Sequence, residues 1–263
     1  MNPPLAYITG ASSGIGEALA LRYLRAGWRV ALVARRGEQL QAWIDAQGLD
    51  ASRARAYAAD VRDVAAIVRA GAECIAQFGL PDVVIANAGI SVGMDTADLE
   101  DLEVLRTTFE TNNVGMAATF HPFLEPMRRR GSGRLVGIAS VAGIRGLPGH
   151  GAYCASKAAA IAYCESLRGE CRGSGVQVVT ILPGYIDTPL TRGNRYPMPF
   201  LMTAQAFADR AFAAIEAGAS YRVIPWQMGV VAKLLRLLPN AWFDRAFAGR
   251  GRKRRRHEQA RER

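Results

Sequence analysis

Short apolar runs alternate with helical segments along most of the chain, and this alternation limits the folds open to it. The runs that we predict to be buried strands are residues 5–9, 29–34, 55–60, 82–87, 134–140, 176–183 and 221–225. Helices are predicted at 14–26, 38–47, 63–78, 99–129, 152–173 and 204–217, with the longest open to a break at Pro122 or Pro126. Strands separated by helices predict a parallel sheet with right-handed crossovers, covered by helices on both faces.

Charge and composition divide the chain into three parts. No glycine-, serine- or proline-rich linker interrupts residues 1–225, so we predict one domain there, an apolar and basic extension at 226–249 and a basic tail at 250–263. The tail has eight Arg or Lys and two Glu, so it carries +6 of the formal net charge of +10. We interpret it as a solvated, disordered end, with non-specific nucleic-acid binding as the alternative and no sign of a specific nucleic-acid partner.

Cysteine spacing and the N-terminal residues bear on metal binding and location. Cys74, Cys154, Cys164 and Cys171 form no C-x-x-C pair and no cluster with histidine, so no metal site is expected. The first residues lack the basic and apolar blocks of a signal peptide, which favours a reducing cytoplasm.

A glycine-rich turn, TGASSGIG (residues 9–16), lies between the first predicted strand and helix. Gly10, Gly14 and Gly16 permit a tight turn whose backbone N–H groups approach an anion, and the helix N-terminus adds partial positive charge. Ser12 and Ser13 can add hydroxyl donors, so a pyrophosphate is the expected ligand. A phosphate loop of the Walker type is disfavoured because Glu follows Gly16, whereas a turn without ligand stays open as the alternative.

The end of the second predicted strand bears on the choice of dinucleotide. Dinucleotide-binding folds usually place an acidic residue there for the ribose 2′-hydroxyl, but this chain has Arg35 and Arg36. A guanidinium suits a 2′-phosphate through charge and paired hydrogen bonds. We therefore predict NADP(H) rather than NAD(H), with a solvated basic turn as the alternative.

Further motifs follow at fixed intervals: Asn87-Ala88-Gly89, the NNVG stretch at 112–115, Ser140, Tyr153, Lys157 and the PGYIDTP stretch at 183–189. Together with the glycine turn, this ordered set resembles the short-chain dehydrogenase/reductase family over about residues 5–225. The resemblance implies a doubly wound Rossmann-type α/β fold with seven parallel strands in the order 3-2-1-4-5-6-7. It also implies a homodimer or homotetramer.

The resemblance implies a cofactor site in which Asp60 and Val61 flank the adenine and Asn87 steadies the central strand. Ile186 and Thr188 would hold the nicotinamide carboxamide. The full set of cofactor-binding residues expected is Gly10, Ser12, Ser13, Gly14, Ile15, Gly16, Arg35, Arg36, Asp60, Val61, Asn87, Ala88, Gly89, Tyr153, Lys157, Pro183, Gly184, Ile186 and Thr188.

Tyr153 and Lys157 are four residues apart and therefore share a helix face. An ammonium about 4 Å from the phenol contributes roughly 4 kcal/mol at an effective dielectric near 20, so we expect it to lower the tyrosine pKa toward neutrality. This is an upper-side value, because burial opposes ionisation of both groups. The catalytic residues implied by the resemblance are Ser140, which binds the substrate oxygen, Tyr153 as acid or base, Lys157, and Asn112 in a proton relay. Asn113 is the alternative register for Asn112.

These features predict an NADP(H)-dependent oxidoreductase that acts on a carbonyl or secondary alcohol. Pro197, Phe200, Leu201 and Met202 suggest an apolar lid and hence an apolar substrate, although a subunit contact or a packed loop fits too. The alternative function is a cofactor-binding regulator without robust turnover, or a protein bound to a membrane surface.

His150 and the segment at residues 226–247 lie outside these motifs. His150 is close to Tyr153 in sequence and could reach the substrate, but we interpret it as a solvated loop residue, as a lone loop histidine more often is, and leave it out of the site. Residues 226–247 contain Lys233, Arg236 and Pro239 and so have no apolar run of about 20 residues that could cross a bilayer. A peripheral membrane contact, a subunit interface and packing near the active site remain as alternatives for this segment.

Overall fold

The computed structural model describes residues 2–194, 196–249, 253, 255 and 258. Its main sheet has seven parallel strands in the order β3-β2-β1-β4-β5-β6-β9, which confirms the predicted order with β9 as the seventh strand. The strands are β1 (Leu5–Thr9), β2 (Arg29–Ala34), β3 (Ala54–Ala58), β4 (Val83–Ala86), β5 (Gly133–Ile138), β6 (Val176–Pro183) and β9 (Tyr221–Ile224).

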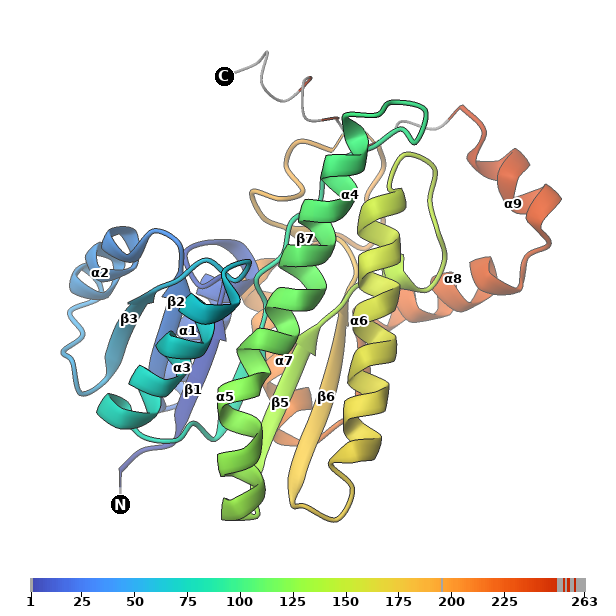
Figure 1. Cartoon of the computed structure of the whole chain (residues 1–263). Helices are drawn as coiled ribbons and strands as arrows, with labels where there is room; N and C mark the ends of the chain where they lie inside the picture. The colour runs from blue at the N-terminus through green and yellow to red at the C-terminus, as the bar shows by residue number, and fades with distance from the viewer. Residues whose placement is uncertain (1, 195, 250–252, 254, 256–257, 259–263) are drawn as a thin grey trace.

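Helices cover both faces of the sheet, as the alternation predicts (Figure 1). The first face carries α1 (Gly14–Arg25), α2 (Gly37–Ala46) and α7 (Ala204–Glu216). The second face carries α3 (Val64–Phe78), α5 (Gly115–Arg130) and α6 (Gly151–Glu170). Each face therefore has its own apolar core, separated from the other by the sheet.

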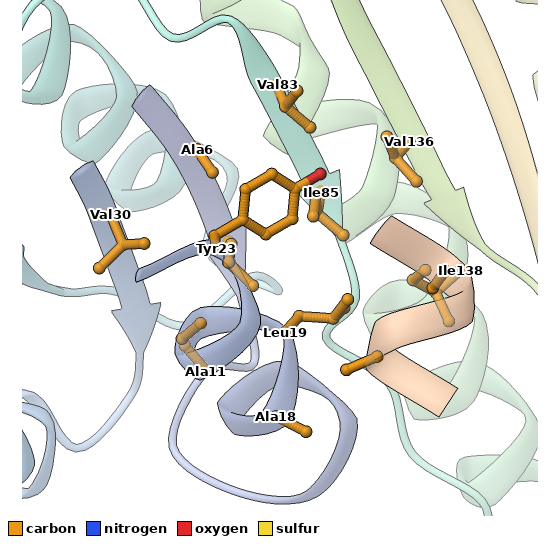
Figure 2. Close-up of a cluster of buried hydrophobic side chains, with 14 of the residues drawn as sticks. Ala6, Ala11, Ala18, Leu19, Tyr23, Val30, Val83, Ile85, Val136 and Ile138 are labelled. Carbon is orange, nitrogen blue, oxygen red and sulfur yellow. The ribbon is translucent and has the colours of Figure 1, made fainter. Parts of the chain in front are cut away.

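The core of the first face is built by α1 on the central strands (Figure 2). Leu19 and Tyr23 of this helix are fully buried and lie against Ala6 of β1 and Ile85 of β4. Burying a side chain such as leucine stabilises a fold by about 1.5–3 kcal/mol, so this contact fixes the N-terminus of α1 at the end of β1. The glycine turn that joins β1 to α1 is held between these two elements.

The long helical stretch predicted at 99–129 differs from the expectation in where it is interrupted. It consists of α4 (Asp101–Phe109), a π-helical turn η1 (Glu110–Val114) and α5, which continues through Pro122 and Pro126. Pro122 packs on α3 at Gly71, where a Cβ atom would lie 2.4 Å from the proline Cγ. Each proline lacks the N–H group that would donate a helical hydrogen bond, and α5 continues past both while it packs closely on α3.

The C-terminal part contains elements that the sequence pattern did not separate. A two-stranded sheet pairs β7 (Ile186–Asp187) with β8 (Met202–Thr203), and a short 3-10 helix η2 (Val141–Gly143) follows β5. The extension forms α8 (Trp226–Leu237) and α9 (Asn240–Phe247), with Pro239 at the start of α9. Within the described ranges, no helix is long and apolar enough to cross a membrane.

Candidate active site

The candidate site lies at the carboxyl edge of the sheet, where the chain runs outward from β1 on one side and from β4 on the other. Such a reversal leaves a crevice between the two strand ends. Thr9 ends β1, and its Oγ1 accepts hydrogen bonds from the backbone N–H of Asn87 (3.1 Å) and of Ala88 (3.3 Å). The Asn87 Nδ2 donates to the carbonyl oxygens of Thr9 (2.9 Å) and Gly10 (3.3 Å). The residues that follow β4 are thus bonded to the glycine turn.

The glycine turn has a backbone shape that side chains would disturb. Gly10 and Gly14 have φ angles of +66° and +61°, in the left-handed region that favours glycine. At Gly16, a Cβ atom would lie 2.2 Å from the carbonyl oxygen of Gly10. The exposed Ser13 is the N-cap residue of α1 but makes no side-chain cap bond. The first amides of α1, which have no partner within the helix, can therefore serve an anion.

Other predicted members of the cofactor site lie around the turn. Thr188 packs at Gly14, where a Cβ atom would lie 3.2 Å from the threonine Cβ. Ile186 is buried, and its carbonyl oxygen accepts a hydrogen bond from Thr191 Oγ1 at 2.6 Å. Ser12 and Ile15 are half-buried, as are Ala88 and Gly184, while Pro183 is buried and Gly89 is exposed. The structure thus brings β7 against the turn that follows β1.

Arg35 and Arg36 are exposed directly after β2, and neither has an ion-pair partner among the described residues. Asp60 lies close to them after β3, and Arg62 pairs with its carboxylate at 2.7 Å. Hydrogen bonds from Arg62 lower the Asp60 pKa most, and the Arg35 charge lowers it further. Two unpaired guanidinium groups are therefore available at the end of β2. Val61 is buried on Gly115, where a Cβ atom would lie 2.9 Å from the valine Cβ.

Ser140 and Tyr153 meet at the carboxyl end of β5. Ser140 Oγ accepts a hydrogen bond from the Ala142 N–H at 3.1 Å, which orients the hydroxyl group. Tyr153 is half-buried near the start of α6. Desolvation of its phenol raises the pKa to about 12, and hydrogen bonding with Ser140 opposes this rise. At neutral pH the phenol is therefore protonated and can donate a proton.

Lys157 lies one turn further along α6 and is almost completely buried. Its Nζ donates to the carbonyl oxygen of Ile138 at 2.8 Å and lies 5.8 Å from the centroid of the Tyr153 ring. Burial lowers the Lys157 pKa to about 8. The expected lowering of the Tyr153 pKa toward neutrality is thus outweighed in this structure, because desolvation disfavours the charged forms of both groups.

Asn112 occupies the π-helical turn, where such irregular helix often positions a functional side chain. Its Nδ2 donates to Ser156 Oγ (2.9 Å) and to the Ile90 carbonyl (3.1 Å), while its Oδ1 accepts from the Ile90 N–H (2.9 Å). A Cβ atom at Gly89 would lie 3.2 Å from Asn112 Oδ1 and 3.5 Å from Lys157 Nζ, so the amide and the ammonium are neighbours. The alternative residue, Asn113, instead donates to the Ser156 carbonyl at 2.9 Å.

His150 does not fit the interpretation as a solvated loop residue, which is wrong. Its side chain is buried, Nδ1 lies 3.0 Å from the Pro148 carbonyl, and Nε2 lies 3.2 Å from Tyr196 Oη. Burial lowers the His150 pKa, so the imidazole is neutral at pH 7. Tyr196 is close enough to Tyr153 for that phenol to raise its pKa. Sequence reasoning missed the pair because 46 residues separate its members.

The loop predicted to be an apolar lid is only partly packed. Phe200 and Leu201 expose about half of their surfaces, whereas Met202 packs against the core on the α1 side. Phe200 has a φ angle of +56°, which is uncommon for a residue other than glycine. The loop therefore leaves two large apolar side chains exposed before β8.

Comparisons with known proteins agree with this geometry. The sequence profile described as short chain dehydrogenase matches residues 4–198. An uncharacterized oxidoreductase of Myxococcus xanthus is 40% identical over 241 residues, which cover 92% of this chain and 95% of that protein.

Among solved structures, a short chain dehydrogenase from Burkholderia cenocepacia in complex with NADP has a TM-score of 0.78 and 26% identity, covering 93% of this chain and 97% of the other. An enzyme from Burkholderia phymatum in complex with NAD has the same TM-score with 22% identity over 89% and 92% of the two chains, and at that identity it supports the fold alone.

The glycine turn generates a binding prediction. We expect Gly16→Ala to weaken NADPH binding at least about tenfold, equivalent to about 1.4 kcal/mol, because the added methyl group displaces the Gly10 carbonyl or Asn87. Fluorescence titration with NADPH measures this effect. Gly146→Ala is the matched control, since nothing lies within 4 Å of that Cβ position. Equal affinity of the two variants would contradict a phosphate-binding role for the turn.

Proposed function

Because the chain belongs to the short-chain dehydrogenase family, we propose that it is an NADP(H)-dependent oxidoreductase that interconverts a carbonyl compound and a secondary alcohol. The observation that carries this proposal is the proximity of Ser140 and Tyr153 at the carboxyl end of β5, with Lys157 buried one turn away. These groups lie at the same edge of the sheet as the glycine turn. The nicotinamide cofactor, when bound, supplies or accepts the hydride.

Each side chain has a task that its surroundings permit. In the direction of reduction, Tyr153 donates its proton to the carbonyl oxygen, while the Ser140 hydroxyl stabilises the negative charge that develops on that oxygen. The Lys157 ammonium stabilises the phenolate that remains and binds the nicotinamide ribose. Asn112 holds the chain after β4 against α6 and positions a water molecule that returns the proton.

The tyrosine makes this mechanism testable. We expect Tyr153→Phe to lower kcat at least about 100-fold, within the usual range for general acid catalysis, with NADPH affinity unchanged. NADPH oxidation over a panel of ketones, aldehydes, steroids and acyl-chain carbonyls measures turnover. Tyr163→Phe, also on α6, is the control. More than about a tenth of the wild-type rate in Tyr153→Phe would exclude the mechanism. A wild-type protein that binds NADPH without turnover would favour the cofactor-binding regulator.

The preference for NADP(H) over NAD(H) rests on Arg35 and Arg36. Both are exposed at the end of β2 without an acidic partner in the described chain, so their charges are free to meet a 2′-phosphate. Asp60, the nearby acid, is already paired with Arg62 and does not compete for them at close range. The Burkholderia cenocepacia relative, above 25% identity, was solved with NADP and agrees with this choice.

A charge reversal at the end of β2 tests this preference. We expect Arg35→Asp to lower the ratio of kcat/KM for NADPH to that for NADH roughly tenfold or more, because a charge-assisted hydrogen bond to phosphate is replaced by repulsion. Arg168→Asp, an exposed position on α6, makes the same charge change elsewhere and is the control. If Arg35→Asp leaves the ratio of kcat/KM for NADPH to that for NADH unchanged, Arg35 does not bind the 2′-phosphate.

We further propose an apolar substrate, a homo-oligomer and a cytoplasmic location. The apolar substrate is supported by Phe200 and Leu201, which are exposed before β8. The assembly and the location follow from the family resemblance and the sequence, and size-exclusion chromatography with light scattering tests the assembly.

A second candidate function, which can coexist with the first, is attachment to an anionic membrane surface through α8 and α9. Figure 1 shows these helices projecting from the end of the molecule beyond α6. They expose a stripe of large apolar side chains, consisting of Trp226, Val230, Leu234, Leu237 and Trp242. The same helices carry Lys233, Arg236 and Arg245 but only one acid, Asp244. An apolar face bordered by cations suits the surface of an anionic bilayer.

Vesicle flotation tests this attachment. We expect the full-length protein to float with phosphatidylglycerol-containing vesicles, and less with neutral ones, and Leu234→Glu/Leu237→Glu to lose most of the binding. Leu99→Glu alters an equally exposed leucine outside the stripe and is the control. If the wild-type protein stays in the soluble fraction, membrane attachment is excluded. If the double variant is instead monomeric where the wild type is a dimer, a second copy of the chain covers the apolar stripe.

A further inference from the structure

Arg255, one of the described residues near the C-terminus, binds the start of α4 and the segment that precedes it. Its Nε donates to Asp101 Oδ2 at 2.7 Å, its guanidinium also pairs with Asp98, and its backbone forms a bridge with Gly93. The Asp101 side chain is only 4% exposed and also accepts a hydrogen bond from the Asp95 N–H at 2.7 Å. Arg255 thus places a cation against a buried carboxylate, where removing one partner of the pair has a large effect.

Lys253, two residues earlier, binds a different segment. Its Nζ donates to the Leu190 carbonyl and to Asn194 Oδ1, both at 2.8 Å. Burial lowers the Lys253 pKa to about 8, and no acidic partner for it occurs among the described residues. Because the two cations are two residues apart, one short piece of chain contacts both segments. The expected solvated, disordered tail therefore does not hold for these two residues, whereas most of 250–263 lies outside the described residues.

Both segments, which we call the two walls, contact the residues at the start of α6 that directly precede Tyr153. The first wall, residues 93–101, contacts the start of α6: the Met94 N–H donates to the Gly149 carbonyl (3.2 Å), and Met94 Sδ accepts from the Ala152 N–H (3.1 Å). The second wall, residues 190–194 and 196, contacts it through the ring of Tyr196, which lies against His150. Figure 1 shows the start of α4 and the loop after β7 at the same end of the molecule.

We propose that Lys253 and Arg255 are positioning residues that tie these two walls together and so determine which carbonyl compounds the site accepts. Neither side chain touches the reacting groups, and their effect is transmitted through Asp101 and Asn194. The expected effect on substrate binding rests on the proposed oxidoreductase function, whereas the link between the two walls does not depend on it. Without these contacts, both walls move more freely and substrate is held less well, while the glycine turn, which neither cation contacts, keeps its hydrogen bonds to Asn87.

The test compares Arg255→Ala with the wild type by hydrogen exchange and by kinetics. We expect faster amide exchange in both walls, a roughly tenfold higher KM for the best carbonyl substrate, equivalent to about 1.4 kcal/mol, and little change in kcat or NADPH affinity. Arg255→Lys should restore much of the loss, and Asp101→Asn should reproduce it without adding to Arg255→Ala. Arg192→Ala removes an exposed ion pair between the second wall and Asp187 of β7 and is the control.

The outcomes separate the tie from the proposed function. If amide hydrogen exchange in either wall is unchanged in the Arg255→Ala variant, these residues do not link the two walls, whatever the activity of the wild type. Faster exchange with an unchanged KM in an active enzyme overturns the role in substrate selection. If the wild type reduces no carbonyl compound in the panel, the proposed function fails, and the exchange result still decides whether the tie exists.

Discussion

The hydrogen bonds between Asn87 and the first strand hold together the part of the sheet on which the whole site depends. They join Thr9 and Gly10 to the end of β4, where the direction of the strand order reverses. Gly16 leaves no room for a side chain between these groups, so the turn cannot open without breaking the bonds. The position of the turn therefore fixes the position of the crevice relative to Ser140 and the following α6.

The catalytic groups show a balance between burial and charge. Lys157 and Tyr153 share a helix face, but desolvation favours their neutral forms and holds the two pKa values at about 8 and 12. The Ile138 carbonyl accepts the lysine hydrogen bond, and Ser140 partly offsets the effect of burial on the phenol. A protonated tyrosine beside the Ser140 hydroxyl is suited to proton donation, which is the chemistry that the proposed carbonyl reduction requires.

The helices α8 and α9 lie outside the central sheet, and a single arginine binds both of them. Arg145 donates hydrogen bonds to the carbonyls of Leu235 and Leu238 and to Asn240 Oδ1, and its guanidinium lies 3.9 Å from the centroid of the Phe243 ring. One arginine thus fixes both α8 and α9 on the body and leaves the other side of α8 uncovered. The position of the exposed apolar stripe follows from this attachment.

The sequence by itself determined the features that depend on local patterns. The alternation of apolar strands and helices gave nearly every element of the sheet, and the glycine spacing identified the turn. Only the tertiary structure decided how Tyr153 titrates, that His150 is buried against Tyr196, and that Arg255 reaches Asp101. Burial and pairing of these groups depend on residues far away in the chain, and a linear pattern does not specify which distant segments will meet. From the sequence, burial is expected only to reduce the lowering of the Tyr153 pKa, whereas desolvation in the structure raises that pKa to about 12, because its size depends on the tertiary packing around the phenol.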